Sequence, residues 1–170
     1  MSSLDVERTW LEMRQPPPAA PFVPLPDVRV QRAAPCPAGF YRFLYGEVGR
    51  AFKWVDRLRW PDARLAAHLA DPAIAIWVAS EGPVPIGYFE LVRHPDDSVE
   101  IAYFGLLPWA VGRGLGRWLL EVAIAEAWRD PPTRVWLHTC TLDHPAALPN
   151  YLKRGFAVTH RERIVQEVPD

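Results

Sequence analysis

Residues 99–118, VEIAYFGLLPWAVGRGLGRW, decide the fold of this chain. The apolar and aromatic run from Glu100 to Leu107 predicts a buried strand, which Pro108 ends because proline cannot donate a hydrogen bond to a sheet. Three glycines then alternate with larger residues: Gly112, Gly114 and Gly116. Glycines let backbone N–H groups approach a ligand closely, and a helix N-terminus adds free N–H groups and partial positive charge. The stretch therefore predicts a strand, a loop and a helix that together can bind a phosphate.

The spacing of these glycines excludes two common phosphate-binding motifs. A P-loop requires G-x-x-x-x-G-K-[ST], and the dinucleotide fingerprint requires G-x-G-x-x-G, whereas this loop reads G-x-G-x-G. A glycine-rich turn can also simply join a strand to a helix. The glycine pattern alone therefore leaves a purely structural role open.

Two motifs in sequence order resemble those of the GNAT superfamily of acyl-CoA-dependent N-acyltransferases. PWAVGRGLGRWLL, Pro108 to Leu120, resembles the pyrophosphate loop, which reads Gln/Arg-x-x-Gly-x-Gly/Ala. YLKRGF, Tyr151 to Phe156, resembles the second motif, Tyr-x-Lys-x-Gly-Phe. The resemblance is close from Val99 to Phe156 and looser from Val28 to Leu91. The chain departs from the family pattern at three positions, which are Val111 in place of Gln or Arg, His144 in place of Asn, and Pro149 before Tyr151.

Composition limits the classes of protein to which the chain can belong. With 170 residues, 49% of them hydrophobic and 23% charged, the chain can bury the core of one globular domain. A net charge of −1 gives no field to hold nucleic acid or an anionic membrane. Cys36 and Cys140 lie far apart, which indicates a reducing compartment and neither a disulfide framework nor a metal site. No signal peptide or membrane span is recognisable, so we expect a cytoplasmic protein.

Residues 1–24 are predicted to form an arm outside the fold. One or two helical turns are expected around Val6, Trp10 and Met13, followed by a proline-rich spacer. Residues 25–170 are predicted to form the acetyltransferase domain. Its expected strands are 28–32, 73–79, 84–92, 100–107, 134–139 and 156–166, and its expected helices lie within 40–54 and at 62–69, 115–129 and 145–154.

This order, β-α-α-β-β-β-α-β-α-β, predicts an α/β fold with a mixed sheet and helices on both faces, which is also the GNAT architecture. Tight turns make the three sequential strands antiparallel, whereas the strand–helix–strand unit after Gly105 must be parallel. Only 14 residues follow Phe156, so the last strand is expected at the edge, alone or completed by a second subunit. A homodimer is therefore one open alternative.

The resemblance implies a binding site for acetyl-CoA and no metal. In the family, the strand before the glycine loop separates from the next parallel strand, which leaves free backbone groups for the pantetheine arm. The cofactor-binding residues implied here are Gly105, Leu106, Leu107, Val111, Gly112, Arg113, Gly114, Leu115, Gly116, Arg117 and His144.

The resemblance also implies two catalytic residues. Glu100 lies where some members carry their general base, and Tyr151 matches the tyrosine that protonates the departing thiolate. Each can instead have only a structural role, Glu100 as an exposed strand residue and Tyr151 as a half-buried aromatic. His138 and His144 are alternative bases, and Cys140 has no adjacent histidine that would indicate a nucleophile.

The function implied is transfer of an acetyl group from acetyl-CoA to a primary amine, by direct attack in a ternary complex. The amine belongs to a small molecule or a peptide, with no nucleic acid or membrane as partner. The alternatives are a non-catalytic acyl-CoA-binding sensor and a structural protein without a nucleotide site. Candidate acceptor residues, left unassigned, are Tyr41, Tyr45, Trp54, Asp56 and Trp60.

Overall fold

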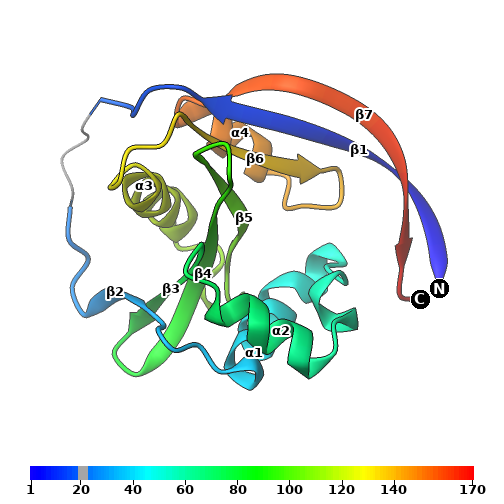
Figure 1. The fold of residues 1–170 in the computed structure, drawn as a ribbon, viewed down its shortest axis with the longest axis horizontal. Coiled ribbons are helices and arrows are strands. Elements are labelled where there is room, and N and C mark those ends of the chain that lie inside the picture. Colours follow the sequence, from blue (N-terminus) through cyan, green and yellow to red (C-terminus); the bar gives the residue numbers. More distant parts are fainter. Residues whose placement is uncertain (19–22) are drawn as a thin grey trace.

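A seven-stranded mixed sheet organises the computed structural model, which describes residues 1–18 and 23–170 (Figure 1). The strands are β1 (Ser2–Met13), β2 (Val28–Arg32), β3 (Ile74–Glu81), β4 (Val84–Arg93), β5 (Ser98–Leu106), β6 (Arg134–Cys140) and β7 (Ala157–Val168). The α-helices are α1 (Ala38–Gly49), α2 (Asp62–Ala70), α3 (Leu115–Ala127) and α4 (Ala147–Lys153). Short 3₁₀ turns are η1 (Arg50–Phe52), η2 (Arg57–Arg59) and η3 (Pro108–Ala110). No helix in these two ranges has the length and apolar character that crossing a membrane requires.

The predicted order of elements is confirmed from β2 onward. The strands lie in the order β2-β3-β4-β5-β6-β1-β7, and β5 pairs with β6 in parallel, whereas β2, β3, β4 and β5 are antiparallel neighbours. Proline and glycine residues end helices and strands near the positions predicted from the sequence. Gly155, for example, has a φ of 107° just after α4, a conformation that a residue with a Cβ rarely adopts.

The N-terminal residues correct our expectation of an arm with helical turns. Residues 2–13 form β1, which lies between β6 and β7 and pairs with both. Leu11 lies opposite Leu137 and Met13 opposite Val135, and all four side chains are buried. The strand forms because of this long-range pairing, which local propensity does not reveal. The expected proline spacer includes residues 19–22, which lie outside the described residues.

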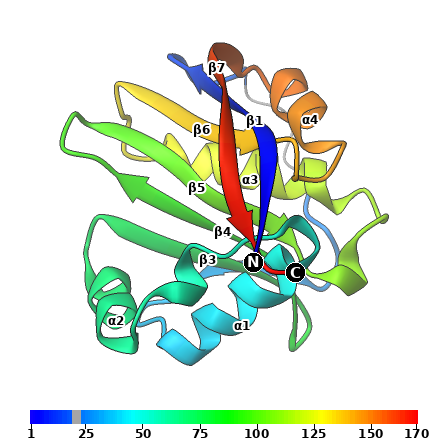
Figure 2. The same ribbon diagram turned by 90° about the vertical axis from the view of Figure 1, so that its right-hand side faces the viewer.

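The strand β1 also answers the question left by the short C-terminus. β7 is a single strand at the edge of the sheet, and its partner is β1 of the same chain. We call β1 and β7 together the terminal ribbon. It curves away from the rest of the sheet, so that the two chain ends lie side by side (Figures 1 and 2). Its end contacts the turn η1, because the Lys53 Nζ donates a hydrogen bond to the carbonyl of Pro169 at 3.3 Å.

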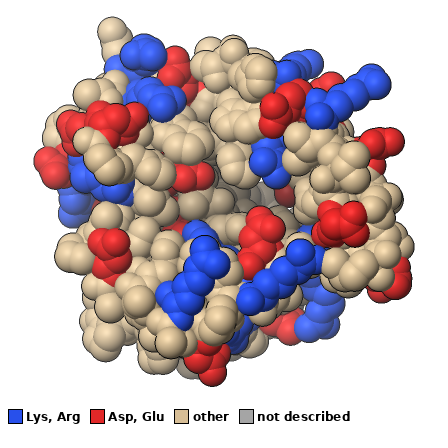
Figure 3. Space-filling view, turned by 45° about the vertical axis from the view of Figure 1, so that its right-hand side comes forward, with Lys and Arg blue, Asp and Glu red and all other residues tan. Residues whose placement is uncertain are grey.

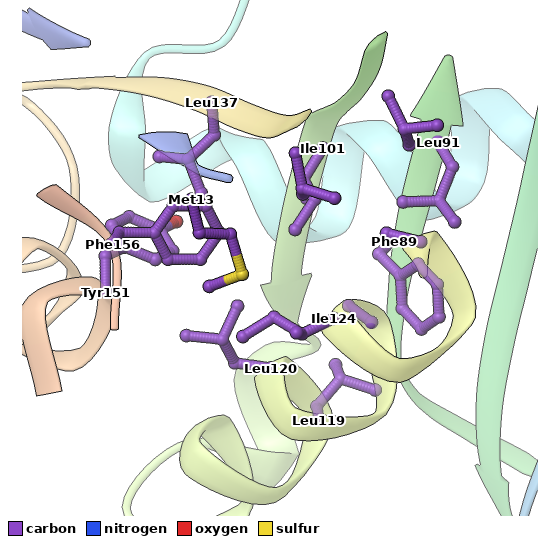
Figure 4. Packing of buried hydrophobic residues seen from close by; sticks show 14 of the residues in the cluster. Met13, Phe89, Leu91, Ile101, Leu119, Leu120, Ile124, Leu137, Tyr151 and Phe156 are labelled. Carbon is purple, nitrogen blue, oxygen red and sulfur yellow. The ribbon is translucent and has the colours of Figure 1, made fainter. Parts of the chain in front are cut away.

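Helices cover both faces of the sheet, as predicted. On one face, which we call the α3 face, Leu119, Leu120 and Ile124 of α3 pack against Phe89 and Ile101 of the sheet (Figure 4). Tyr151 and Phe156 extend this cluster from α4 and its end. On the opposite α1 face, a second cluster joins α1 and α2 to β3 and β4. Burial of the first cluster holds α3 against β4 and β5.

Candidate active site

The strands β5 and β6 separate and open a cavity between them. They pair only at Ser98–Arg134, Val99–Val135 and Glu100–Trp136. Beyond these pairs both strands continue without pairing to each other, and a cavity of about 580 Å³ lies there. Figure 3 shows the molecular surface hollowed near its centre, with basic and acidic side chains around the rim. The expected parting of two parallel strands is therefore present, and it begins after Glu100.

Backbone groups of β5 face the gap. The Leu107 N–H donates to the Ile86 carbonyl at 2.9 Å, so it is used in pairing with the β4 side. Backbone direction alternates along an antiparallel strand, so Gly105 also points to β4, whereas Phe104 and Leu106 point into the cavity. This corrects the expected role of Leu107, which is fully buried and does not line the cavity. The backbone N–H groups that face the cavity are therefore those of Phe104 and Leu106.

The glycine loop forms one end of the cavity, as the motif predicts. Gly112 and Gly114 have φ values of 83° and 74°, and Gly114 immediately precedes α3. These angles suit glycine because a Cβ would strain the backbone. The cavity wall here consists of Val111, Gly112, Gly114, Leu115, Gly116 and Arg117. The first N–H groups of α3 are therefore close to the cavity, where they can bind an anion.

The arginines of this loop differ in their roles. Arg113 was expected to meet phosphate, but its guanidinium makes two hydrogen bonds to Glu81, at 2.8 and 3.2 Å, and does not line the cavity. Arg117 lines the cavity and is exposed. Two further cations at the wall, Lys153 and Arg154, were missed, although both stand within the YLKRGF motif. Positive charge thus reaches this end from α3 and α4, although Arg117 and Arg154 both contact the Glu121 carboxylate, at 3.2 and 2.6 Å.

Tyr151 lies in the cavity wall, where α4 places it. Its ring contacts Phe104 and Phe156 edge-on, with centroids 6.4 and 6.1 Å away. Burial, followed by the nearby charge of Asp143, raises the pKa of the Tyr151 hydroxyl well above its usual value. The hydroxyl is therefore protonated at neutral pH and holds its proton more tightly than an exposed tyrosine does.

Asp143 and His144 occupy the loop before α4 and line the cavity. The Asp143 carboxylate accepts hydrogen bonds from the Thr139 hydroxyl at 2.5 Å and from the Cys140 N–H at 3.1 Å. His144 Nδ1 accepts the N–H of Ala146 at 3.0 Å, at the start of α4. His144 is thus where the resemblance implied, whereas Asp143 was missed because no spacing marks a loop carboxylate.

Glu100 lies beside the cavity and does not line it. It is the last β5 residue paired with β6, its side chain is 14% exposed, and it accepts a hydrogen bond from His94 Nε2 at 2.9 Å. Val99 and Ile101 belong to the α3 cluster, so Glu100 points to the α1 face. The expected base therefore has a partner already.

His138 of β6 also points to the α1 face, and it opens into the cavity. The His138 side chain is exposed to the open cavity, and desolvation by the surrounding walls, followed by the charge of Arg8, lowers its pKa below the usual value. Its imidazole is consequently neutral at pH 7 and can accept a proton. Burial and then Asp143 raise the pKa of the Cys140 thiol, which disfavours the thiolate that a nucleophile needs.

Aromatic residues form the α1 side of the cavity. Tyr103 contacts both Trp54 and Tyr45 edge-on, with centroids 5.0 and 4.9 Å apart. Of the five candidate acceptor residues, the cavity is lined by Tyr45, Trp54 and Asp56. Tyr41 is instead buried and donates a hydrogen bond to Glu90, and Trp60 stacks with arginines outside the wall. Only tertiary structure separates these two groups.

The terminal ribbon closes the cavity from the remaining side. It contributes Arg8 from β1 and Gln166 from β7, neither of which the sequence indicated. Among residues 1–18 and 23–170, no three His, Cys, Asp or Glu side chains gather in a way that could hold a metal ion.

Comparisons with known proteins give a family and a fold. A family model described as "Acetyltransferase (GNAT) family" matches residues 41–156. No curated protein matches the chain. Among solved structures, a GCN5-related N-acetyltransferase from Sphaerobacter thermophilus is 19% identical, with a TM-score of 0.63 over 95% of this chain and 50% of that one. A GCN5-related N-acetyltransferase from Kribbella flavida is 17% identical, with a TM-score of 0.64 over 96% and 58%.

A third similar structure is a spermidine N-acetyltransferase from Vibrio cholerae in complex with CoA and spermine. It is 19% identical, with a TM-score of 0.60 over 82% of this chain and 92% of that one. At such identities the likeness shows the fold alone, and it confirms the fold predicted from the sequence. The chain spans about half to two thirds of the length of the first five solved structures that it matches.

Proposed function

The chain belongs to the GNAT acetyltransferase family, and from this premise we propose that it transfers an acetyl group from acetyl-CoA to a primary amine of a small molecule or peptide. One observation carries the proposal. The stretches of β5 and β6 that no longer pair with each other border the same cavity as the glycine loop. A thioester arm and a diphosphate need these two features together.

The donor would be bound mainly by backbone. The N–H groups between Gly112 and Gly116 suit the pyrophosphate, and Arg117, Lys153 and Arg154 add positive charge there. The backbone groups of Phe104 and Leu106 would pair with the pantetheine amides as an added strand does. An N–H of this pair would also stabilise the oxyanion that forms on the thioester carbonyl.

For the chemical step, we assign His138 as the group that takes the proton from the amine. The amine nitrogen attacks the thioester carbonyl carbon, the C–S bond breaks, and the ammonium proton passes to the neutral imidazole. Glu100, which we expected as the base, lies on the same face of the sheet, and its charge raises the pKa of His138. We therefore give Glu100 the role of positioning and stabilising protonated His138.

Tyr151 is the proposed donor of the second proton. The departing CoA thiolate takes the hydroxyl proton, so that one proton leaves the amine and one reaches the thiol. The raised pKa makes Tyr151 a weaker acid than an exposed tyrosine, so the proposal rests on the place of its side chain in the cavity wall, beside the unpaired stretch of β5.

Three measurements test the proposed function. Isothermal titration with acetyl-CoA is expected to show binding, and a panel of primary amines is expected to release CoA thiol. Mass spectrometry of the protein with acetyl-CoA alone should show no acetyl-enzyme, since attack is direct. Absence of acetyl-CoA binding at millimolar concentration would refute the proposal. Binding without thiol release for any amine would instead favour a non-catalytic acyl-CoA sensor.

A further inference from the structure

Arg8 brings a positive charge into the cavity from outside the residues that the family model matches. It lies on β1, whereas the family match begins at residue 41. Its register places it opposite Cys140 of β6, and the next residue on the same face, Trp10, lies opposite His138. The Trp10 and His138 rings are 5.9 Å apart. Arg8 therefore shares a face with the proposed proton acceptor.

Arg8 forms no ion pair with an acidic side chain of the described residues, although Asp56 and Asp143 line the same cavity. Its Nε is buried without a hydrogen-bond partner, and its guanidinium lies 5.7 Å from the centroid of the Trp10 ring. Glu162, opposite Arg8 on β7, lies 3.6 Å from His160. Glu7 points to the other face, toward Arg161. A partly buried cation without a counter-ion is unfavourable, so an anionic ligand at this place would be stabilised.

The position of Arg8 indicates whether the acyl donor or the acceptor carries the anion that Arg8 would bind. The donor phosphates belong near the glycine loop, which leads into α3 on the α3 face and has Arg117, Lys153 and Arg154 nearby. Arg8 lies instead on the α1 face, and its charge lowers the pKa of His138. An anion at Arg8 is therefore next to the attacking amine, on the acceptor side of the thioester.

We propose that Arg8 binds a carboxylate of the acceptor, so that the substrate is a small amine that also carries a carboxylate, such as an α-amino acid. This inference rests on the proposed function. The aromatic wall of Tyr45, Trp54 and Tyr103 favours an apolar or aromatic acceptor side chain. The terminal ribbon, held to η1 through Lys53, covers the site and favours a small acceptor.

The test compares amino acids with their own carboxamides. Each pair keeps the amine and the side chain and differs in the negative charge. The amide has the less basic amine, so intrinsic reactivity works against the expected result. We expect the wild-type protein to prefer the acid at least about tenfold in kcat/KM, measured by thiol release. Arg8→Gln is expected to bring this ratio close to one, and Arg8→Lys to restore part of it.

Arg163→Gln is the matched control, because it removes an exposed arginine of the terminal ribbon on the opposite face. It should keep the acid-to-amide ratio. Titration of each variant with CoA and with dephospho-CoA separates the two sources of an anion. A loss of CoA affinity in Arg8→Gln that dephospho-CoA does not show would assign Arg8 to a donor phosphate and overturn the proposal.

Equal kcat/KM values for acids and amides in the wild-type protein would also overturn it, and this comparison decides alone if Arg8→Gln does not fold. An equal loss on both members of a pair would make Arg8 merely structural. If amides react and acids do not, the proposal that Arg8 binds an acceptor carboxylate fails, whereas the proposed acetyl transfer stands. If CoA binds and no amine reacts, the proposed function itself fails.

Discussion

Replacing Glu90 by glutamine should destabilise the protein strongly, because Glu90 is the centre of a buried network. Its carboxylate is fully buried and accepts hydrogen bonds from the Tyr41 hydroxyl at 2.5 Å and from Arg57 at 2.9 Å. His68 Nε2 lies 3.0 Å from the same carboxylate. The Glu90→Gln side chain keeps the shape but leaves Arg57, only 14% exposed, without its counter-ion.

Removal of one member of a buried ion pair costs about 3–5 kcal/mol, a large part of the 5–15 kcal/mol that is typical of a domain. Urea unfolding followed by tryptophan fluorescence measures this difference. Glu81→Gln is the control, because it breaks the exposed pair with Arg113 and should leave the unfolding midpoint unchanged. A loss below about 1 kcal/mol for Glu90→Gln would refute the assignment of a stabilising network.

The same network gives a pH signature whose sign follows from the pKa of Glu90. Burial alone would raise this pKa, but the hydrogen bonds from His68 and Tyr41 and the charge of Arg57 together hold it below the usual 4.5. A carboxylate with a lowered pKa in the folded state stabilises fully above its unfolded pKa, and this stabilisation is lost as the pH falls below about 4.5. The free energies of unfolding of wild type and Glu90→Gln should therefore converge in acid.

Three further predictions test the site and the packing around it. Tyr151→Phe should lower kcat at least about tenfold, which is about 1.4 kcal/mol of barrier, without changing the acetyl-CoA affinity measured by titration; an unchanged kcat would exclude Tyr151 as the proton donor. For His138, kcat/KM should fall as the pH drops through a value below 6.5, and His138→Gln should lose this acid limb, whereas a retained limb would point to another base. Gly105→Ala would place a Cβ 2.4 Å from Val48 Cγ1 and should cost about 1–3 kcal/mol in urea unfolding, whereas Gly46→Ala, with no atom within 4 Å, should stabilise α1 by about 0.5–1 kcal/mol; similar effects of both would contradict the close approach of α1 to β5.

The strands and helices from β2 onward could be predicted because their signals are local. The glycines after Pro108 mark the loop, the apolar face of 115–127 marks α3, and Gly155 marks the end of α4. Each of these signals acts within a few residues, where backbone sterics and side-chain periodicity decide the outcome. The same reasoning located the glycine loop, which forms one end of the cavity.

Side-chain contacts that form only in the folded chain could not be assigned from the sequence. Arg113 looked like a phosphate ligand in its motif, but Glu81, on another strand, holds it away. Asp143 carries no recognisable spacing, yet folding brings it to Thr139 and near Tyr151. Glu100 has the expected place in sequence, and only the contact with His94 reveals that its carboxylate is already engaged.

By itself the sequence determined the glycine loop, the order of elements after residue 27 and the family, since all three depend on residues that are neighbours along the chain. The tertiary structure alone decided the place of residues 2–13 and hence the shape of the acceptor side. The strand β1 is stable only because Leu11 and Met13 pair with residues more than a hundred positions away. That pairing depends on the whole sheet being formed, and it is what carries Arg8 to His138.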